Sequence, residues 1–353
     1  MEPFQAFSLG SGRSLSGKPR QARKIAHRMG ELGGRGVRGA EAGRTGGEGT
    51  LPGMASQLNL RGVYVAAVTP FGRDGGLALD ALEGLAHGFL DAGAAGIVAL
   101  GTTAEAAALE KEEKRAVIDA CARACAERGA QLIVGAGTNN TAASVAAVQE
   151  LAGTPALVAA LSVVPYYVRP SEAGIIEHFR AVAAASPVPL LVYNIPYRTG
   201  RALGSASLLT LAAEPNIAGV KQAVGSIDLD TLEVLAGAPR NGGFAVLGGD
   251  DAYLFPTVLM GGAGTVAASA NIATERFVAM IECGLAGKLD EGRALSEALL
   301  PVVKRLFAEP NPSVIKGVLH ALGKIPTPSL RLPMTPASTA AVDAAMTALE
   351  KLP

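Results

Sequence analysis

Residues 156–194 read ALVAALSVVPYYVRPSEAGIIEHFRAVAAASPVPLLVYN, and this stretch decides the fold. An apolar run, Ala156–Val164, is followed by a helical pattern, Glu172–Ala185, and then by a second apolar run, Pro189–Asn194. The runs are continuously apolar rather than alternating, which is typical of strands buried on both faces of a parallel sheet. The stretch therefore predicts one strand–helix–strand unit of an α/β protein.

The same unit recurs along the chain in both directions from this stretch. The apolar runs are Val63–Thr69, Gly96–Leu100, Leu132–Ala136, Ala156–Val164, Pro189–Asn194, Ile217–Lys221, Phe244–Gly248 and Gly264–Ser269. Eight such units predict a (β/α)8 TIM barrel over residues 54–273. Helical patterns near 274–287, 289–307, 313–322 and 337–351 predict a helical C-terminal region over residues 274–353. A doubly wound dinucleotide-binding fold is disfavoured, because no G-x-G-x-x-G opens a helix after a strand.

The first 53 residues differ in composition from the rest. They carry nine Lys/Arg against four Glu, and thirteen of them are glycine. Because they show no apolar periodicity, we expect a disordered basic extension over residues 1–53. A transit peptide and a nucleic-acid-binding tail are the alternatives for this segment. The remaining residues carry a net charge of −5, which argues against nucleic acid as the main partner.

The overall composition indicates a folded protein in a reducing compartment. Of 353 residues, 49% are hydrophobic and 18% charged, which is enough apolar material for one large core. No apolar run reaches the ~18 residues of a membrane span, so we expect a soluble chain. Three cysteines without a C-x-x-C pair favour the cytoplasm. The four histidines lack metal-ligand spacing, so neither a metal nor a nucleotide cofactor is expected.

Lys221 is the most informative polar residue. In a (β/α)8 barrel the reactive groups lie at the carboxyl ends of the strands, a region here called the mouth. Lys221 ends the apolar run Ile217–Lys221, whereas other lysines lie in polar or amphipathic helical stretches. A lysine in an apolar mouth is partly desolvated, which favours the free amine that attacks carbonyl carbons. The alternative is a strand-end lysine whose ammonium reaches water.

Tyrosines cluster near the same position. The chain has six tyrosines and no tryptophan, yet Tyr166, Tyr167, Tyr193 and Tyr197 follow two neighbouring strands. Phenols gathered at a mouth can relay protons, as the formation and breakdown of a Schiff base require.

Other polar residues at strand ends suit the binding of carboxylates. Thr102 and Thr103 offer hydroxyl and N–H donors, although either could cap a helix. Arg198 can hold a carboxylate with two hydrogen bonds, or it is an ordinary surface arginine. Asp250 and Asp251 are expected to cap the helix that follows them.

Several stretches together resemble a known family over about residues 60–351. They are AVTPF (67–71), GTTAE (101–105), VPYYVRPSEAGIIEHF (164–179), YNIPYRTG (193–200), VKQA (220–223), GGDD (248–251), LFAEPNPSVIK (306–316) and LRLPMTP (330–336). The family is that of the pyruvate-dependent class I aldolases, which includes dihydrodipicolinate synthase and N-acetylneuraminate lyase. YNxPxRTG and the tail are similar to the synthase branch, and neuraminate lyases lack an arginine at the position of Arg198.

The resemblance implies four catalytic residues. Lys221 would form the Schiff base with pyruvate, and Tyr193 would donate and accept protons. Tyr193 would be linked through Thr102 to Tyr167, which would reach into the site of a neighbouring subunit. A tight dimer within a homotetramer would then be needed for full activity.

The resemblance also implies the substrates. Thr103 and the backbone around Val266 would hold the pyruvate carboxylate, and Arg198 would hold that of L-aspartate 4-semialdehyde. The product would be 4-hydroxy-tetrahydrodipicolinate, on the lysine (diaminopimelate) pathway, and no cofactor is implied. The alternatives are another 2-oxo-acid aldolase, acting on 4-hydroxy-2-oxoglutarate or a 2-keto-3-deoxy sugar acid, and a non-catalytic barrel.

The chain departs from the family pattern near the mouth. Ala104 stands where the family has glycine, and a positive φ there would strain an alanine by about 1 kcal/mol or more. Gln222 replaces a typical glutamate after the lysine, and Tyr197 stands where serine is common. These departures leave the lysine chemistry intact and bear on substrate preference.

The feedback site for L-lysine that the family implies is also altered. Asn139 and Tyr166 match, but Ala143 replaces a glutamate, and Lys111 and Lys114 replace histidines. The loss of a carboxylate and the gain of positive charge both weaken binding of a cationic effector. We therefore expect weak or absent inhibition by lysine.

Overall fold

The computed structural model describes residues 58–239 and 243–352. Within these ranges eight parallel strands pair in chain order, and the last pairs with the first to close a barrel. They are β1 (Gly62–Ala66), β2 (Gly96–Ala99), β3 (Gln131–Gly135), β4 (Leu157–Val163), β5 (Leu190–Asn194), β6 (Ile217–Gln222), β7 (Ala245–Gly248) and β8 (Gly264–Ala267). Each strand overlaps one of the predicted apolar runs, so the predicted (β/α)8 barrel is confirmed.

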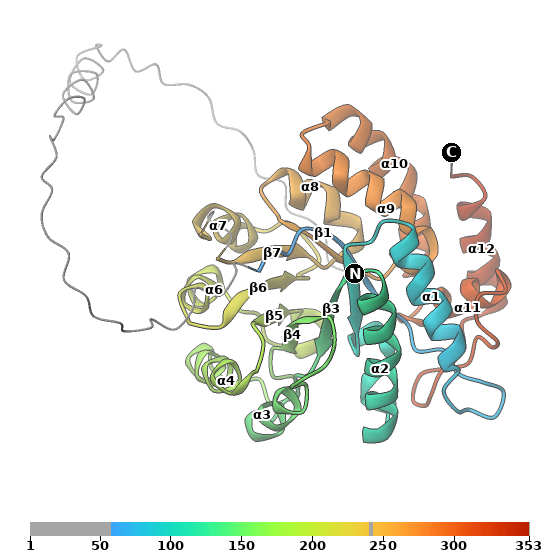
Figure 1. Cartoon of the computed structure of the whole chain (residues 1–353). Helices are drawn as coiled ribbons and strands as arrows, with labels where there is room; N and C mark the ends of the chain where they lie inside the picture. The colour runs from blue at the N-terminus through green and yellow to red at the C-terminus, as the bar shows by residue number, and fades with distance from the viewer. Residues whose placement is uncertain (1–57, 240–242, 353) are drawn as a thin grey trace, which may run out of the picture. The chain divides into compact units, whose positions relative to one another are not determined.

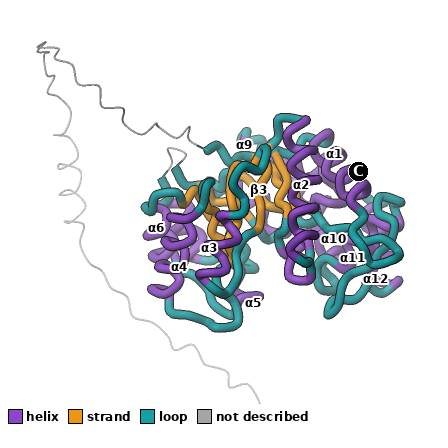
Figure 2. The backbone as a smooth tube through the Cα atoms, turned by 60° about the horizontal axis from the view of Figure 1, so that its bottom comes forward, coloured by secondary structure: helices purple, strands orange, loops and turns teal. Residues whose placement is uncertain are grey.

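Helices follow the strands and cover the outside of the barrel, as the purple helices around the orange strands show in Figure 2. They are α1 (Leu79–Asp91), α2 (Lys111–Glu127), α3 (Thr141–Gln149), α4 (Glu172–Ala185), α6 (Ser205–Ala212), α7 (Leu229–Gly237), α8 (Leu254–Leu259) and α9 (Ala270–Leu285). A short helix, α5 (Pro196–Thr199), lies in the loop after β5. Short 3-10 turns, η1 (Thr102–Ala104), η2 (Ala106–Ala108) and η3 (Asp251–Tyr253), follow β2 and β7.

The apolar core has two layers, which explains the continuous hydrophobicity of the strands. Alternate strand residues face opposite sides, so Val63 and Val65 of β1 pack outward with the helices. Tyr64 and Ala66 belong to the layer inside the barrel. Because both faces of each strand are buried, polar side chains are confined largely to the strand ends.

The C-terminal region is helical, as predicted. After α9 come α10 (Leu289–Leu306), α11 (Ser313–Ala321) and α12 (Thr339–Leu349), drawn in orange to red in Figure 1. α9 packs on β1 and β8, while α10 and α11 pack against α12. The domain boundaries expected at residues 53 and 273 stay predictions, and residues 1–53 lie outside the described ranges.

Three further observations concern the described residues. None of their helices is long and apolar enough to cross a membrane. All three cysteines are free, and Cys121 and Cys125 are buried in α2. Nowhere in the described ranges do three His, Cys, Asp or Glu side chains gather in a way that could hold a metal ion.

Candidate active site

Lys221 and Tyr193 lie side by side at the mouth of the barrel. They are partners in the parallel pairing of β5 with β6, so their side chains point inward at the same level. The Nζ atom of Lys221 lies 4.2 Å from the centroid of the Tyr193 ring. The exposed fraction is 6% for Lys221 and 5% for Tyr193. The amine is therefore desolvated and faces a phenol.

A glycine at the end of β7 leaves room for the lysine side chain. A Cβ atom built on Gly249 would lie 2.9 Å from both Cγ and Cε of Lys221, closer than side chains pack. Among the described residues, no carboxylate oxygen lies within 4.0 Å of the Lys221 amine. A buried amine that makes no direct ion pair is suited to attack a carbonyl carbon.

Asp250 and Asp251 form hydrogen bonds with the loops around Lys221. Asp250 accepts a hydrogen bond from the backbone N–H of Gly225, and Asp251 accepts from the N–H groups of Ala268 and Ser269. Burial raises the pKa of both carboxyls, and these hydrogen bonds and the charge of Lys221 oppose the rise. The prediction that the pair caps the next helix is wrong, since neither side chain caps η3 or α8. Both carboxylates instead accept hydrogen bonds from backbone N–H groups of the neighbouring loops.

The loop after β2 presents the two threonines of the GTTAE stretch. Thr103 is buried, and its Oγ1 accepts a hydrogen bond of 3.0 Å from Nδ2 of Asn311. Thr102 is half-buried beside it. Glu105 adopts the left-handed conformation, with φ of 53°, whereas Ala104 is not among the residues with positive φ. The alanine that replaces the family's glycine is therefore not strained.

The expected proton relay is not assembled within one chain. Tyr167 lies in the loop between β4 and α4, where its side chain is 87% exposed. Among the described residues, no hydrogen bond joins the hydroxyl of Thr102 to Tyr193 or Tyr167. One chain thus brings Tyr193 to Lys221 and leaves Tyr167 facing solvent.

Arg198 lies on α5, in a loop that is held by Asn194. The buried Asn194 amide bonds both the N–H and the C=O of Leu203 at 3.2 Å, and it donates to the side chain of Gln222 at 3.1 Å. Arg198 itself is exposed, with Cζ 5.5 Å from the centroid of the Tyr197 ring. No described carboxylate lies within ion-pair distance of Arg198, so its guanidinium can accept an anion.

Tyr197 belongs to the same group, although it was not a predicted site residue. Burial of the phenol raises its pKa, with nearby Tyr193 and Asp250 adding to the rise and Arg198 opposing it. Tyr197 is nevertheless 62% exposed, and its ring contacts the Arg198 guanidinium at 5.5 Å. The sequence marked this residue as one of the four clustered tyrosines and by its place in YNIPYRTG, where serine is common.

Val266 lies inside the barrel on β8. Its side chain is 1% exposed and packs in the same interior layer as Tyr193. This places the backbone around Val266 at the β8 end of the mouth.

A charge cluster that sequence reasoning missed lies behind the loop of Thr102 and Thr103, here called the threonine loop; Lys316 and Glu105 are buried, and Glu113 and Arg331 are half-buried. Nζ of Lys316, which is fully buried, lies 2.8 Å from Oε1 of Glu105 and donates to the carbonyl oxygen of Thr69 at 3.0 Å. The backbone N–H of Arg331 donates to Oε2 of Glu105 at 2.9 Å, and its guanidinium pairs with Glu113. We call Glu105, Glu113, Lys316 and Arg331 the C-terminal clamp. The signal for it was present in LFAEPNPSVIK and LRLPMTP, which supply Lys316 and Arg331.

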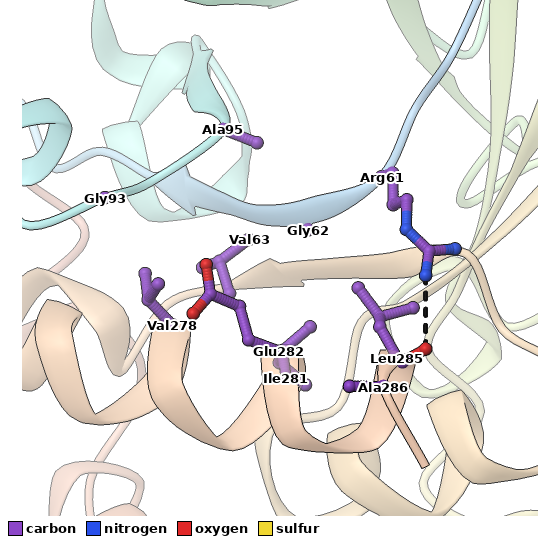
Figure 3. A pocket seen from close by; sticks show the side chains of 10 residues that line it. All are labelled: Arg61, Gly62, Val63, Gly93, Ala95, Val278, Ile281, Glu282, Leu285 and Ala286. Atoms are coloured by element: carbon purple, nitrogen blue, oxygen red, sulfur yellow. Dashed lines mark hydrogen bonds between the residues drawn. The ribbon is translucent and has the colours of Figure 1, made fainter. Parts of the chain in front are cut away.

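A pocket of about 390 Å³ lies at the other end of β1 and is separate from this site (Figure 3). Arg61, Gly62 and Ala95 line it, at the amino ends of β1 and β2, and Arg61 donates to the carbonyl oxygen of Leu285. None of the predicted site residues lines this pocket. Because catalysis in such barrels occurs at the carboxyl ends of the strands, this pocket is not the candidate active site.

Comparisons with known proteins point to one family. The model of the dihydrodipicolinate synthetase family matches residues 59–352. The 4-hydroxy-tetrahydrodipicolinate synthase of Neisseria meningitidis serogroup B is 40% identical over 279 residues, which cover 78% of this chain and 93% of that protein. The dihydrodipicolinate synthase structure from Thermotoga maritima superposes with a TM-score of 0.80 at 30% identity, covering 83% of this chain and 99% of that one. The chloride-inhibited enzyme from Acinetobacter baumannii, complexed with pyruvate, has a TM-score of 0.77 at 33% identity, with coverages of 82% and 98%.

Proposed function

The chain belongs to the dihydrodipicolinate synthetase family, and we propose that Lys221 is the residue on which it binds pyruvate covalently. Its activity is that of a 4-hydroxy-tetrahydrodipicolinate synthase, a class I lyase of lysine (diaminopimelate) biosynthesis. The enzyme condenses pyruvate with L-aspartate 4-semialdehyde. The single observation that carries the assignment of Lys221 is its buried amine, 4.2 Å from the Tyr193 ring and with no carboxylate oxygen of the described residues within 4.0 Å.

The chemistry follows from this arrangement. The free amine of Lys221 attacks C2 of pyruvate, and loss of one water gives the imine. Removal of a proton from C3 gives the enamine, whose C3 attacks the aldehyde carbon of the second substrate. Tyr193, against the amine, is positioned to donate and accept the protons of these steps. Hydrolysis or cyclisation at C2 then releases Lys221.

A second copy of the chain completes the proton relay. The 87% exposure of Tyr167 supports a role outside its own barrel. In this proposal the phenol enters the neighbouring subunit's mouth and links through Thr102 to Tyr193. The enzyme would then be a dimer at least, and a homotetramer built as a dimer of dimers is the proposed assembly. The cytoplasm is the proposed location, supported by three free cysteines.

The carboxylates of the two substrates bind on different sides of Lys221. Thr103 and the backbone around Val266 are proposed to hold the pyruvate carboxylate. Arg198 is proposed to hold the carboxylate of aspartate semialdehyde, supported by its exposed guanidinium and its position on the loop after β5. The shared name of the relatives favours this aldehyde over those of other 2-oxo-acid aldolases.

Borohydride trapping tests the assignment of Lys221. Reduction in the presence of pyruvate is expected to add one pyruvate-derived group to the peptide that contains Lys221. The second buried lysine, Lys316, provides an internal control, because its ion pair with Glu105 removes it as a nucleophile. An adduct on Lys316, or on no lysine, would overturn the assignment.

Arg198→Ala tests how the aldehyde is recognised. Loss of a charge-assisted pair is expected to lower kcat/KM for aspartate semialdehyde about 100-fold while the pyruvate adduct still forms. Arg201→Ala is the matched control. Arg201 lies three residues away, and its guanidinium forms an ion pair with Glu172 at 3.8 Å, so it is not left for a substrate carboxylate. Equal losses in the two variants would contradict the role of Arg198.

A further inference from the structure

The C-terminal region contacts the threonine loop through Asn311. This residue lies between α10 and α11, is 9% exposed, and donates from Nδ2 to Oγ1 of Thr103 at 3.0 Å. Its Oδ1 atom is buried without a hydrogen-bond partner among the described residues. The amide therefore contacts the threonine loop through its donor side.

The direction of this hydrogen bond determines what the threonine hydroxyl can do. A hydroxyl has one proton to donate and two lone pairs that accept. Asn311 fills one lone pair of Thr103, and no described acceptor takes the Thr103 proton. The hydroxyl is thus left with its proton available to an anion in the mouth.

We propose that Asn311 is a positioning residue, which orients the Thr103 hydroxyl so that its proton points to the carboxylate of pyruvate. This inference rests on the proposed role of Thr103 in binding that carboxylate. It assigns to the C-terminal region a direct part in the affinity for the first substrate. Asn311 itself acts through Thr103.

The C-terminal clamp fixes both partners of this hydrogen bond. Glu105, two residues after Thr103, pairs at 2.8 Å with Lys316, five residues after Asn311. Thr69 accepts from the same lysine through its carbonyl oxygen and donates through Oγ1 to the carbonyl of Ala104 at 2.8 Å. Because the loop and the C-terminal segment share one buried ion pair, the Asn311–Thr103 contact is held at fixed geometry.

An amide is required at position 311 for a simple electrostatic reason. An aspartate of the same shape accepts hydrogen bonds only, so it would take the Thr103 proton away from the substrate. Its charge would also repel the pyruvate carboxylate. Asn311→Asp should therefore impair pyruvate binding more than Asn311→Ala, although aspartate is the closer match in size.

A double-mutant cycle on the full-length enzyme tests the proposal. Thr103→Val and Asn311→Ala are each expected to raise KM for pyruvate about 10-fold, with kcat and the KM for aspartate semialdehyde within about 2-fold. The double variant should be no worse than Thr103→Val, since Asn311 has no effect without the hydroxyl. Asn311→Asp should raise KM for pyruvate at least about 100-fold. Ser313→Ala is the control, because Ser313 bonds the carbonyl of Thr335 and not the threonine loop.

The outcomes separate this inference from the proposed function. Effects that multiply in the double variant would show that Asn311 does not act through Thr103, while the role of Thr103 would stand. A normal KM for pyruvate in Thr103→Val would overturn both the proposed role of Thr103 and the inference about Asn311. Where Asn311→Ala does not fold, Asn311→Leu, which also lacks the donor and carries no charge, takes its place in the cycle with Thr103→Val. An Asn311→Asp enzyme with unchanged KM for pyruvate would also overturn the inference.

Discussion

The mouth and the C-terminal clamp are built from the same kinds of residue. In the mouth, Nζ of Lys221 lies 4.2 Å from an aromatic centroid, and Cζ of Arg198 lies 5.5 Å from another. In the clamp, Nζ of Lys316 and Cζ of Arg331 lie 4.1 Å and 4.7 Å from the centroid of Phe71. Both regions thus combine a buried lysine with an arginine on an aromatic face.

The regions differ in their anions. Lys316 pairs with Glu105 and Arg331 with Glu113, whereas no described carboxylate lies within 4.0 Å of Lys221 or Arg198. Burial lowers the pKa of Lys316, and the charge of Glu105 opposes that shift. The two buried lysines therefore serve different purposes. Lys316 and Arg331, which pair with carboxylates of the chain, stabilise the fold. Lys221 and Arg198, which form no such pair, remain available to substrates.

Among the tests of this contrast, Lys221→Met should have the largest effect. Turnover should fall at least about 10⁴-fold, because the covalent intermediate cannot form. The free energy of unfolding should change by less than about 1 kcal/mol, since no carboxylate loses its partner. Steady-state kinetics and urea denaturation measure the two quantities. Substantial turnover in this variant would identify a different nucleophile and remove the contrast between the two lysines.

Lys316→Met should have the opposite signature. It leaves the Glu105 carboxylate buried without its counter-ion, which costs about 3–5 kcal/mol of unfolding free energy. Urea denaturation at neutral pH measures this loss. Adding Glu105→Gln should restore most of the stability, because the amide oxygen can still accept from the N–H of Arg331. If the single variant is as stable as Lys221→Met, the ion pair does not stabilise the clamp.

The two regions were not equally predictable from sequence. Lys221 was found because it ends an apolar run, where a lysine is conspicuous. Lys316 lies in an amphipathic helical pattern, and such a pattern does not tell a lysine in a buried ion pair from one in water. Its partner Glu105 lies 211 residues away in the chain, so only tertiary structure reveals the pair.

The barrel itself was predictable for a local reason. Eight strands buried on both faces leave eight apolar runs, and the spacing between the runs fits one helix each. Side-chain direction was less predictable. Asp250 and Asp251 follow β7 in a sequence context typical of helix caps, yet they bond loops after β6 and β8. Tyr167 follows β4 as expected, but nothing in the pattern of one chain shows that it faces solvent.

Acid should weaken the clamp through Glu113. The hydrogen bond from Arg331 lowers the pKa of Glu113 from 4.5 to about 2. Because the folded value is the lower one, this stabilisation is complete above about pH 4.5 and is lost as pH falls towards 2. Glu113→Gln should therefore cost about 1 kcal/mol at pH 7, solvent screening included, and less at pH 3.5. Urea denaturation of both proteins at the two pH values checks this. A difference that grows in acid would contradict the assigned pair.

Inhibition by L-lysine should be the smallest of these effects, because the effector site lacks an anion for the ligand's ammonium. The residues that the family's effector site implies include Lys111, whose Nζ lies 2.6 Å from Oε1 of Glu150. A lysine is positively charged near neutral pH, and Glu150 raises the pKa of Lys111 further. The ammonium repels a cationic effector, and the Glu150 carboxylate is already paired with it. With Ala143 in place of a carboxylate, half-inhibition should not be reached at about 1 mM lysine. A dose–response curve on the wild type measures this, and strong inhibition below that concentration would contradict it. Ala143→Glu with Lys111→His should lower the half-inhibitory concentration, because the two changes add an anion for the effector's ammonium and remove the charge that repels it.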